Sequence, residues 1–282
     1  MTTLWNHRWS RLNFVHAGLL LALCHAGIFV SAGFAQDPDG SRTPLQRAIE
    51  KQKARLSSAE VEERRDAVVH LQVLHHPDAS RVAVAALSDV SPIVRATATT
   101  AVLSLPVSES AASLIPLLDD KDEFVRQEAA YALGKTRSEG AVSPLIERLA
   151  RDKKHGVRGA AVVALGEIRS ESGVVALSQI LRPELAAASR KKKKSKSKEN
   201  VFVLRSAARS LGQIGSRAGV PALLAVVQDE NAEGDVRREA ANALGSIGDP
   251  AALPTLNSAM NASDPYLAHA AYEASRKISR RQ

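Results

Sequence analysis

The chain has 282 residues, of which 45% are hydrophobic, 24% charged and only 4% aromatic, and its formal net charge is +8. This balance is typical of a globular protein and excludes a chain too polar to bury a core. Few aromatic residues beside abundant alanine favour closely packed helices over a β-sandwich, so we expect an all-α fold.

The first 35 residues have the pattern of a secretory signal peptide. Arg8 and Arg11 give a positive start, a mainly apolar stretch follows, and Gly33 and Ala35 are small residues spaced as a cleavage site requires. We therefore expect residues 1–35 to be removed and the protein to be exported, periplasmic or extracellular, with a bacterial envelope as its setting.

Two alternatives for this segment stay open. Residues 14–35 are long enough to anchor the chain in a membrane if they are not cleaved, although His16 and His25 disfavour a span. A lipoprotein signal ending at Cys24 is a weaker alternative, because Leu23 stands where such signals place a small residue.

Cysteine chemistry is not expected in the mature chain. Cys24 is the only cysteine, so a chain that starts at Gln36 has none. It can form no disulfide, no thiolate nucleophile and no cysteine-ligated metal site. A cysteine-free domain also suits an oxidising compartment.

A repeated pattern follows the short linker that we expect at residues 36–42. Small or apolar residues occupy the first, fifth, eighth, ninth and twelfth places of each clear copy, which puts them on one face of a helix. The clear copies start at Val94, Val125, Val157, Val203 and Val236, and fainter copies start at Glu63 and Leu267.

Each copy is preceded by a second apolar stripe, so each predicts the second helix of an antiparallel pair. We expect about seven pairs between Thr43 and Ile278, with Thr43 as the first N-cap and Pro44 in the first turn. A glycine follows the ninth place in four copies, where it either ends the helix or lets a neighbour approach. These glycines are Gly134, Gly166, Gly212 and Gly245.

The clear copies have the form "VRxxAxxALGxI" after a turn aspartate, as in "VRQEAAYALGKT" and "VRREAANALGSI". This motif resembles the HEAT repeat, in the short bacterial form familiar from phycobilin lyase subunits. The resemblance implies an α-solenoid of about seven antiparallel helix hairpins, a HEAT-like superhelix, over residues 43–282. It implies little about function, because this architecture serves many tasks.

Arginine recurs at the second place of the copies, and aspartate recurs in the preceding turns. The spacing lets each guanidinium reach the turn carboxylate of its own or an adjacent repeat, as a structural ladder worth about 0.5 to 1 kcal/mol for each partly exposed pair. One copy has Leu204 instead and lacks the turn aspartate, so we expect both partners to be missing together. The ladder residues are Asp89, Arg95, Asp120, Arg126, Asp152, Arg158, Asp229 and Arg237, and Arg64 is a further arginine at the second place.

No catalytic constellation is evident. The chain has no phosphate-binding glycine loop, no nucleophile elbow, no zinc-type His and Glu spacing and no His-Glu dipeptide of the kind used by metal-dependent HEAT hydroxylases. We expect no enzymatic activity, no catalytic residue, no cofactor and no metal. An accessory subunit of a lyase or another enzyme is an alternative that the resemblance implies.

The solvent-facing places of the second helices are the candidate partner surface. By helical spacing these are the third and seventh places of each copy, and Tyr and Arg there are common interface anchors. We expect a monomeric scaffold that binds a partner protein of unknown identity along the concave face. The partner-binding candidates are Arg65, Gln127, Tyr131, Arg205, Arg209, Arg238 and Asn242.

A basic insert at about 184–200 lengthens one repeat interval to 46 residues, where the others are 31 to 33. It carries most of the net charge, because seven cations and Glu199 sum to +6, Arg8 and Arg11 add +2, and the remainder is neutral. A neutral repeat body makes nucleic acid an unlikely ligand. We expect the insert to be disordered. The cations are Arg190, Lys191, Lys192, Lys193, Lys194, Lys196 and Lys198.

The insert gives a second functional hypothesis. A lysine-rich loop without aromatic residues suits weak contact with an anionic membrane lipid or cell-surface polymer better than base stacking, so an electrostatic tether is the alternative to a protein-binding scaffold.

The signal-peptide hypothesis predicts the first residue of the mature protein. N-terminal sequencing or intact mass of the protein from its native source should show a chain that starts at Gln36. A chain that retains Met1 and stays with the membrane fraction would favour the uncleaved anchor.

Overall fold

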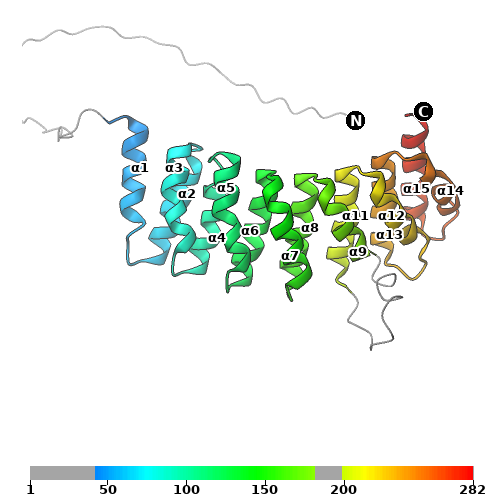
Figure 1. The fold of residues 1–282 in the computed structure, drawn as a ribbon, viewed down its shortest axis with the longest axis horizontal. Coiled ribbons are helices and arrows are strands. Elements are labelled where there is room, and N and C mark those ends of the chain that lie inside the picture. Colours follow the sequence, from blue (N-terminus) through cyan, green and yellow to red (C-terminus); the bar gives the residue numbers. More distant parts are fainter. Residues whose placement is uncertain (1–41, 182–198, 282) are drawn as a thin grey trace, which may run out of the picture. The chain divides into compact units, whose positions relative to one another are not determined.

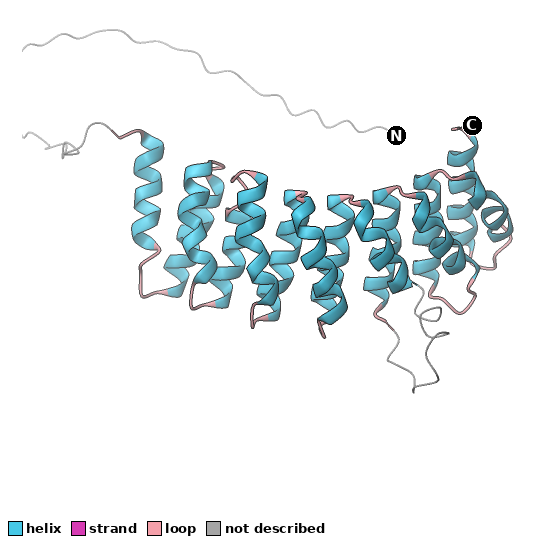
Figure 2. Ribbon diagram, viewed as in Figure 1, coloured by secondary structure: helices cyan, strands magenta, loops and turns pink. Residues whose placement is uncertain are grey.

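The structure is a computed structural model that describes residues 42–181 and 199–281. The predicted signal peptide, most of the linker and the insert up to Lys198 lie outside the described residues. The described part of the chain contains helices, turns and no strand (Figure 2). Residues 43–282 form a compact unit.

Seven helix pairs follow one another and stand side by side in chain order (Figure 1). The first helices are α1 (Pro44–Arg55), α3 (Pro77–Ala83), α5 (Val107–Leu114), α7 (Val142–Arg151), α9 (Val174–Leu181), α12 (Val220–Gln228) and α14 (Leu253–Ala259). The second helices are α2 (Val61–Val73), α4 (Pro92–Ala101), α6 (Glu123–Thr136), α8 (His155–Ile168), α11 (Val201–Ile214), α13 (Gly234–Ile247) and α15 (Pro265–Ser279). The predicted α-solenoid of about seven hairpins is confirmed.

Short 3₁₀ segments complete the first layer of helices. Two of them extend α3 and α5, and the others open the later pairs. After α5 the change follows from Pro116, which has no backbone N–H to continue the α-helical hydrogen bonds. The segments are η1 (Val84–Ser88), η2 (Ile115–Asp119), η3 (Glu139–Ala141), η4 (Glu171–Gly173), η5 (Arg217–Gly219) and η6 (Pro250–Ala252).

Local sequence sets where helices begin. Thr43 caps α1 in a reciprocal arrangement, in which its Oγ1 accepts from the Gln46 backbone N–H at 3.2 Å and Gln46 Oε1 accepts from the Thr43 N–H at 2.8 Å. Asp122 caps α6 by accepting from the backbone N–H groups of Phe124 and Val125. These caps satisfy N–H groups that have no partner inside their own helix.

The core lies between the first and second helices and uses the repeated apolar places. In α6 the residues Val125, Ala129, Ala132 and Leu133 are fully buried. The corresponding places of the other second helices are buried as well, except Glu63 and His70 of α2, which are exposed. Burial of this one continuous stripe is what drives each pair to pack on its neighbours.

The four repeated glycines lie inside the second helices and do not end them. A Cβ at Gly134 would lie 2.8 Å from Ala164 Cα, and one at Gly245 would lie 2.7 Å from Ala274 Cα. The glycine of one second helix therefore faces a small residue at the eighth place of the next. Absence of a side chain lets the two backbones approach closely.

Crowding at these glycines predicts a large steric effect of a side chain. Gly245→Val should lower the free energy of unfolding by about 3 kcal/mol, because its methyl groups meet the backbone of α15. The control is Gly140→Val, since a Cβ there meets nothing closer than 3.6 Å. Equal denaturation midpoints for the two variants would contradict the close contact between second helices.

Candidate functional site

Each ladder arginine in the first half of the array reaches forward to the next helix pair. Arg95 Nε donates to Asp120 Oδ2 at 2.7 Å, and its Nη2 donates to Asp120 Oδ1 at 2.8 Å. Its Nη1 donates backward to the carbonyl oxygen of Asp89 at 2.8 Å. The guanidinium thus joins its own turn to the following turn through a bidentate contact.

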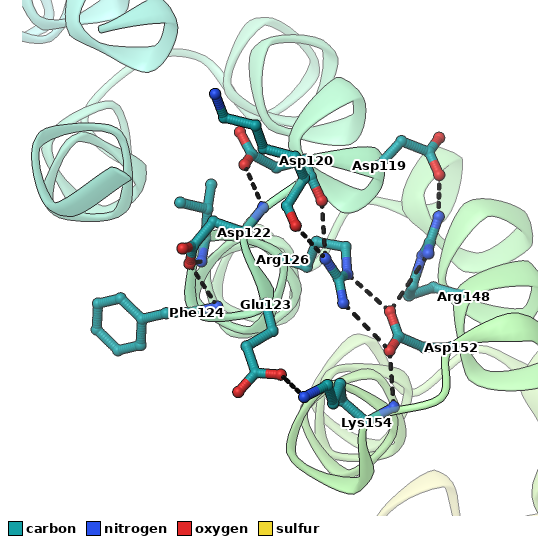
Figure 3. A network of polar contacts seen from close by, with 11 residues as sticks. Asp119, Asp120, Asp122, Glu123, Phe124, Arg126, Arg148, Asp152 and Lys154 are labelled. Atoms are coloured by element: carbon teal, nitrogen blue, oxygen red, sulfur yellow. Dashed lines mark hydrogen bonds and ion pairs between the residues drawn. The ribbon is translucent and has the colours of Figure 1, made fainter. Parts of the chain in front are cut away.

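The same contact repeats on either side. Arg64 Nε lies 2.7 Å from Asp89 Oδ2, and Arg126 Nε lies 2.8 Å from Asp152 Oδ2. Figure 3 shows Arg126 between the carbonyl of Asp120 and the carboxylate of Asp152, which also accepts from Arg148 at 3.3 Å. The spacing allows each arginine to reach the carboxylate of its own repeat or of an adjacent repeat. In the structure the carboxylate belongs to the adjacent repeat.

These pairs are more buried than the sequence analysis assumed. The side chains of Arg95 and Asp120 are only 8% and 12% exposed. The hydrogen bond from Arg64 holds the pKa of Asp89 below its usual range. At Asp120 burial acts to raise the pKa, but hydrogen bonds from Arg95 and from the Asp122 backbone outweigh it, so the pKa is lowered.

The ladder continues across the insert, which corrects the expectation that both partners vanish together. A forward contact means that the missing turn aspartate affects Arg158 of the preceding pair and not the copy with Leu204. Arg158 Nη2 donates to Glu199, which lies at the C-terminal end of the insert. Glu199 also lies 3.4 Å from Nδ1 of His155. Its longer side chain replaces the missing aspartate.

The ladder stops at the fifth pair, whose second helix has Leu204 in place of arginine, and the predicted contact between Asp229 and Arg237 does not form. Arg237 donates through Nε and Nη2 to the carbonyl oxygen of Val227, at 3.1 and 2.9 Å. Asp229 accepts from the backbone N–H of Asn231. The physical reason is again the forward direction, because Leu204 cannot donate to Asp229 and the turn before α15 offers Arg237 no aspartate at the equivalent place, Ala262.

We call the solvent-exposed side of the second helices the second-helix face. Its centre is the residue just before the first place of each copy, together with the seventh and eleventh places. The third place, which was predicted to belong to this face, lies at the edge of the face. Two third-place residues, Ala96 and Gly159, are buried. Contact between neighbouring second helices uses this edge.

The arginine candidates on the second-helix face are held by carboxylates of the next helix. Arg209 Nε and Nη2 donate to Glu239 at 2.9 and 3.1 Å. Arg205 lies 3.9 Å from Asp235. Arg238 Nη1 donates to Asp264 at 3.1 Å, and its guanidinium carbon lies 5.4 Å from the centre of the Tyr266 ring. Their charges are therefore balanced within the array.

The other candidates differ in exposure. Arg65 is exposed and pairs with Glu62 at 2.9 Å. Gln127 is half-buried because its side chain lies over Gly156 of α8. Asn242 is exposed and, with Arg209, lines an open pocket between α11 and α13.

Tyr131 is half-buried on α6 and packs against the core. Burial raises the pKa of its hydroxyl, and the negative charges of Glu128 and Glu167 add to this effect. The structure therefore places Tyr131 beside two carboxylates, a combination that the sequence analysis did not identify.

A row of exposed apolar residues at the centre of the second-helix face was also missed. Ile93, Phe124, Phe202 and Tyr266 stand just before the first place of their copies and are 36%, 45%, 40% and 72% exposed. Aligning the copies by their first residue and examining the preceding column would have found them. The candidate site is this row, with Tyr131 and the paired charges around it.

The lysine-rich candidates cannot be placed, because Arg190, Lys191, Lys192, Lys193, Lys194, Lys196 and Lys198 lie outside the described residues. Within 42–181 and 199–281, no three His, Cys, Asp or Glu side chains are grouped so that they could hold a metal ion. None of the helices in this part of the chain combines the length and apolarity that crossing a membrane requires.

The buried ladder predicts a position-specific loss of stability. Asp120→Asn should lower the free energy of unfolding by about 2 to 3 kcal/mol, because Arg95 stays buried without a carboxylate. The neighbouring Asp119 is 80% exposed and forms a surface ion pair with Arg148, so Asp119→Asn serves as the control with an effect below about 1 kcal/mol. Urea denaturation measures both.

Lowering the pH should reduce the difference between the parent protein and Asp120→Asn. The folded-state pKa of Asp120 lies below the unfolded value of about 3.9, so its stabilisation is complete above that value and is lost as pH falls through the folded pKa. A difference that persists unchanged at pH 2 would show that the charge of Asp120 does not cause it.

Comparison with solved structures finds matches at low identity, and the engineered protein described next has a similar fold. An engineered protein is 20% identical, with 82% of this chain and 68% of that chain covered at a TM-score of 0.51. The complex of CpcE and CpcF of phycocyanin lyase from Nostoc sp. PCC7120 is 21% identical over 82% of this chain and 94% of that chain, with a TM-score of 0.49. Human deoxyhypusine hydroxylase in complex with glycerol is 17% identical over 83% and 96%, with a TM-score of 0.36.

A comparison with curated proteins finds no match. The model of the family described as HEAT repeats matches residues 49–133, 80–166, 112–188 and 195–276. These overlapping matches cover most of the chain and follow the helix pairs of the structure. The chain belongs to the HEAT repeat family, as the resemblance in its repeated motif indicated.

Proposed function

We propose that the chain is an exported, non-enzymatic scaffold that binds a partner protein along the second-helix face. A HEAT-type array is a protein-binding architecture, which offers a long continuous surface built from equivalent helices. Export rests on the pattern of residues 1–35, and the second-helix face corresponds to the surface that we expect to be concave.

The exposed apolar row carries this proposal. Ile93, Phe124 and Phe202 are large apolar side chains at equivalent places of α4, α6 and α11, on the side opposite the core. Exposed large apolar residues that share one face mark interaction surfaces, and aromatic residues are enriched among interface anchors.

Two of these aromatic side chains are already held in place. The ring of Phe202 lies over Gly159 of α8, where a Cβ would collide with it. Tyr266 lies beneath the guanidinium of Arg238. A side chain that is fixed before binding loses less conformational entropy on binding, so such residues suit a partner-binding surface.

The way in which the ionisable groups of this face are used supports a non-enzymatic role. The arginines of α11 and α13 pair with carboxylates of the next helix, and Arg209, which lines the open pocket between these helices, is itself paired with Glu239. General acid-base or nucleophilic catalysis needs groups aimed at one reacting position. The alternative of a lyase subunit rests on the resemblance alone.

The proposal predicts that aromatic truncation on one face abolishes partner capture. The double variant Phe124→Ala with Phe202→Ala should lose a partner that crosslinks to the parent protein in the native envelope fraction. The control is Val107→Ala with Val175→Ala, which truncates side chains that are 54% and 66% exposed on the first helices α5 and α9. Unchanged folding is checked by circular dichroism and the melting temperature.

Two results would contradict the proposal. One is a parent protein that captures no crosslinkable partner from its native fraction. The other is a partner lost equally from the control variant, because that would place binding on the first helices instead of the second-helix face.

A further inference from the structure

The charges on the second-helix face are not all balanced within the array. Arg205, Arg209 and Arg238 each have a carboxylate partner on the next second helix. Glu128 on α6 and Glu167 on α8 are half-buried, and neither forms an ion pair or hydrogen bond with any residue in 42–181 or 199–281. These two half-buried carboxylates are therefore left available to a cation of a ligand.

The two carboxylates flank Tyr131 on the surface of α6. Glu128 lies about one helical turn before Tyr131, and Gly134 lies about one turn after it. Glu167 reaches across from α8, so a Cβ at Gly134 would lie 2.8 Å from Glu167 Oε2. The absent side chain at Gly134 gives that carboxylate its place over α6, and both carboxylates influence the Tyr131 hydroxyl.

The geometry points to a basic partner: we propose that the segment that docks on the second-helix face places a lysine or arginine side chain beside Tyr131, between Glu128 and Glu167. This inference rests on the proposed function and specifies the chemistry of the partner. A half-buried carboxylate without a partner is costly to desolvate, and a cation satisfies two of them at once. The aromatic ring adds a favourable surface for the same cation.

Charge complementarity is specific to this position of the array. One repeat further on, the equivalent residues are Ala160, Val163 and Gln213, and Gln213 lies over Gly166 as Glu167 lies over Gly134. The side chain over the glycine thus has the same position in that repeat, but it carries no negative charge. Lys135, at the eleventh place of the α6 copy, is exposed and forms no ion pair with Glu128 or Glu167. We infer one basic anchor, with apolar contacts to Phe124 and Phe202 on either side.

Selection from an unbiased peptide library tests this inference. Immobilised full-length protein would be presented with a random library of 12-residue peptides displayed on phage, and the selected sequences would be counted. We expect enrichment of peptides that combine a lysine or arginine with apolar residues. Affinities of synthesised winners would then be measured by fluorescence anisotropy at two salt concentrations.

The decisive variant is Glu128→Gln with Glu167→Gln, which keeps shape and removes charge. It should weaken the selected basic peptides by roughly tenfold or more and lose the enrichment in lysine and arginine. The control is Glu147→Gln on α7, where the carboxylate pairs with Arg151 on a first helix. That variant should select and bind as the parent protein does.

The other outcomes overturn the inference in distinguishable ways. Binders without basic residues, or basic binders that the double variant keeps, refute the basic anchor and leave the scaffold proposal standing. A library that yields no binder at all counts against both. Tighter peptide binding after deletion of residues 190–198 would assign the site to this chain's own basic segment and overturn a separate partner. Concentration-dependent dimerisation that the double variant abolishes would assign it to a second copy.

Discussion

The forward contact between an arginine and the aspartate of the next turn is the constraint on which the arrangement depends. Arg95 donates to its own turn and to the next turn with one rigid guanidinium, so it fixes the distance and the relative rotation of two consecutive pairs. Because the contact is nearly buried, an imperfect geometry costs more than it would on the surface. Equivalent residues of successive second helices consequently face the same side, which is what makes a continuous row such as Phe124 and Ile93 available to a partner.

Close backbone approach supplies the second constraint. Where Gly134 meets Ala164, the two helices come close enough for side chains of one to lie over the other. This close approach explains why Glu167 reaches α6. A similar approach of α11 and α13 lets Arg209 donate two hydrogen bonds to Glu239. Charges on this face are therefore balanced mostly between helices, and any charge that remains unbalanced, as at Glu128, is informative about what binds there.

The sequence was sufficient for the helix pairs and their core, because a buried stripe with a regular period leaves little freedom in helix number or orientation. It was insufficient for the ladder, since an offset of six residues from Asp89 to Arg95 fits a contact within one turn as well as a contact between turns. The exposed face was predicted only in part, because the seventh place lies at its centre and the third place lies at its edge. Helical periodicity predicts only which side of an isolated helix is opposite the core. In the array, the contact between Gly134 and the next second helix leaves the third place at the edge of the exposed face. The pairing of Arg209 and the environment of Tyr131 depend on neighbouring helices, which no single-helix pattern encodes.

Glu199 has a consequence for how this array tolerates change. Arg158 finds its acceptor in Glu199, two residues before α11, so this contact links the start of α11 to α8. Loop closure becomes only slowly more costly as a loop lengthens. The turn of the fifth pair is therefore a place where segments of different length can be exchanged, provided that a carboxylate for Arg158 is restored just before α11.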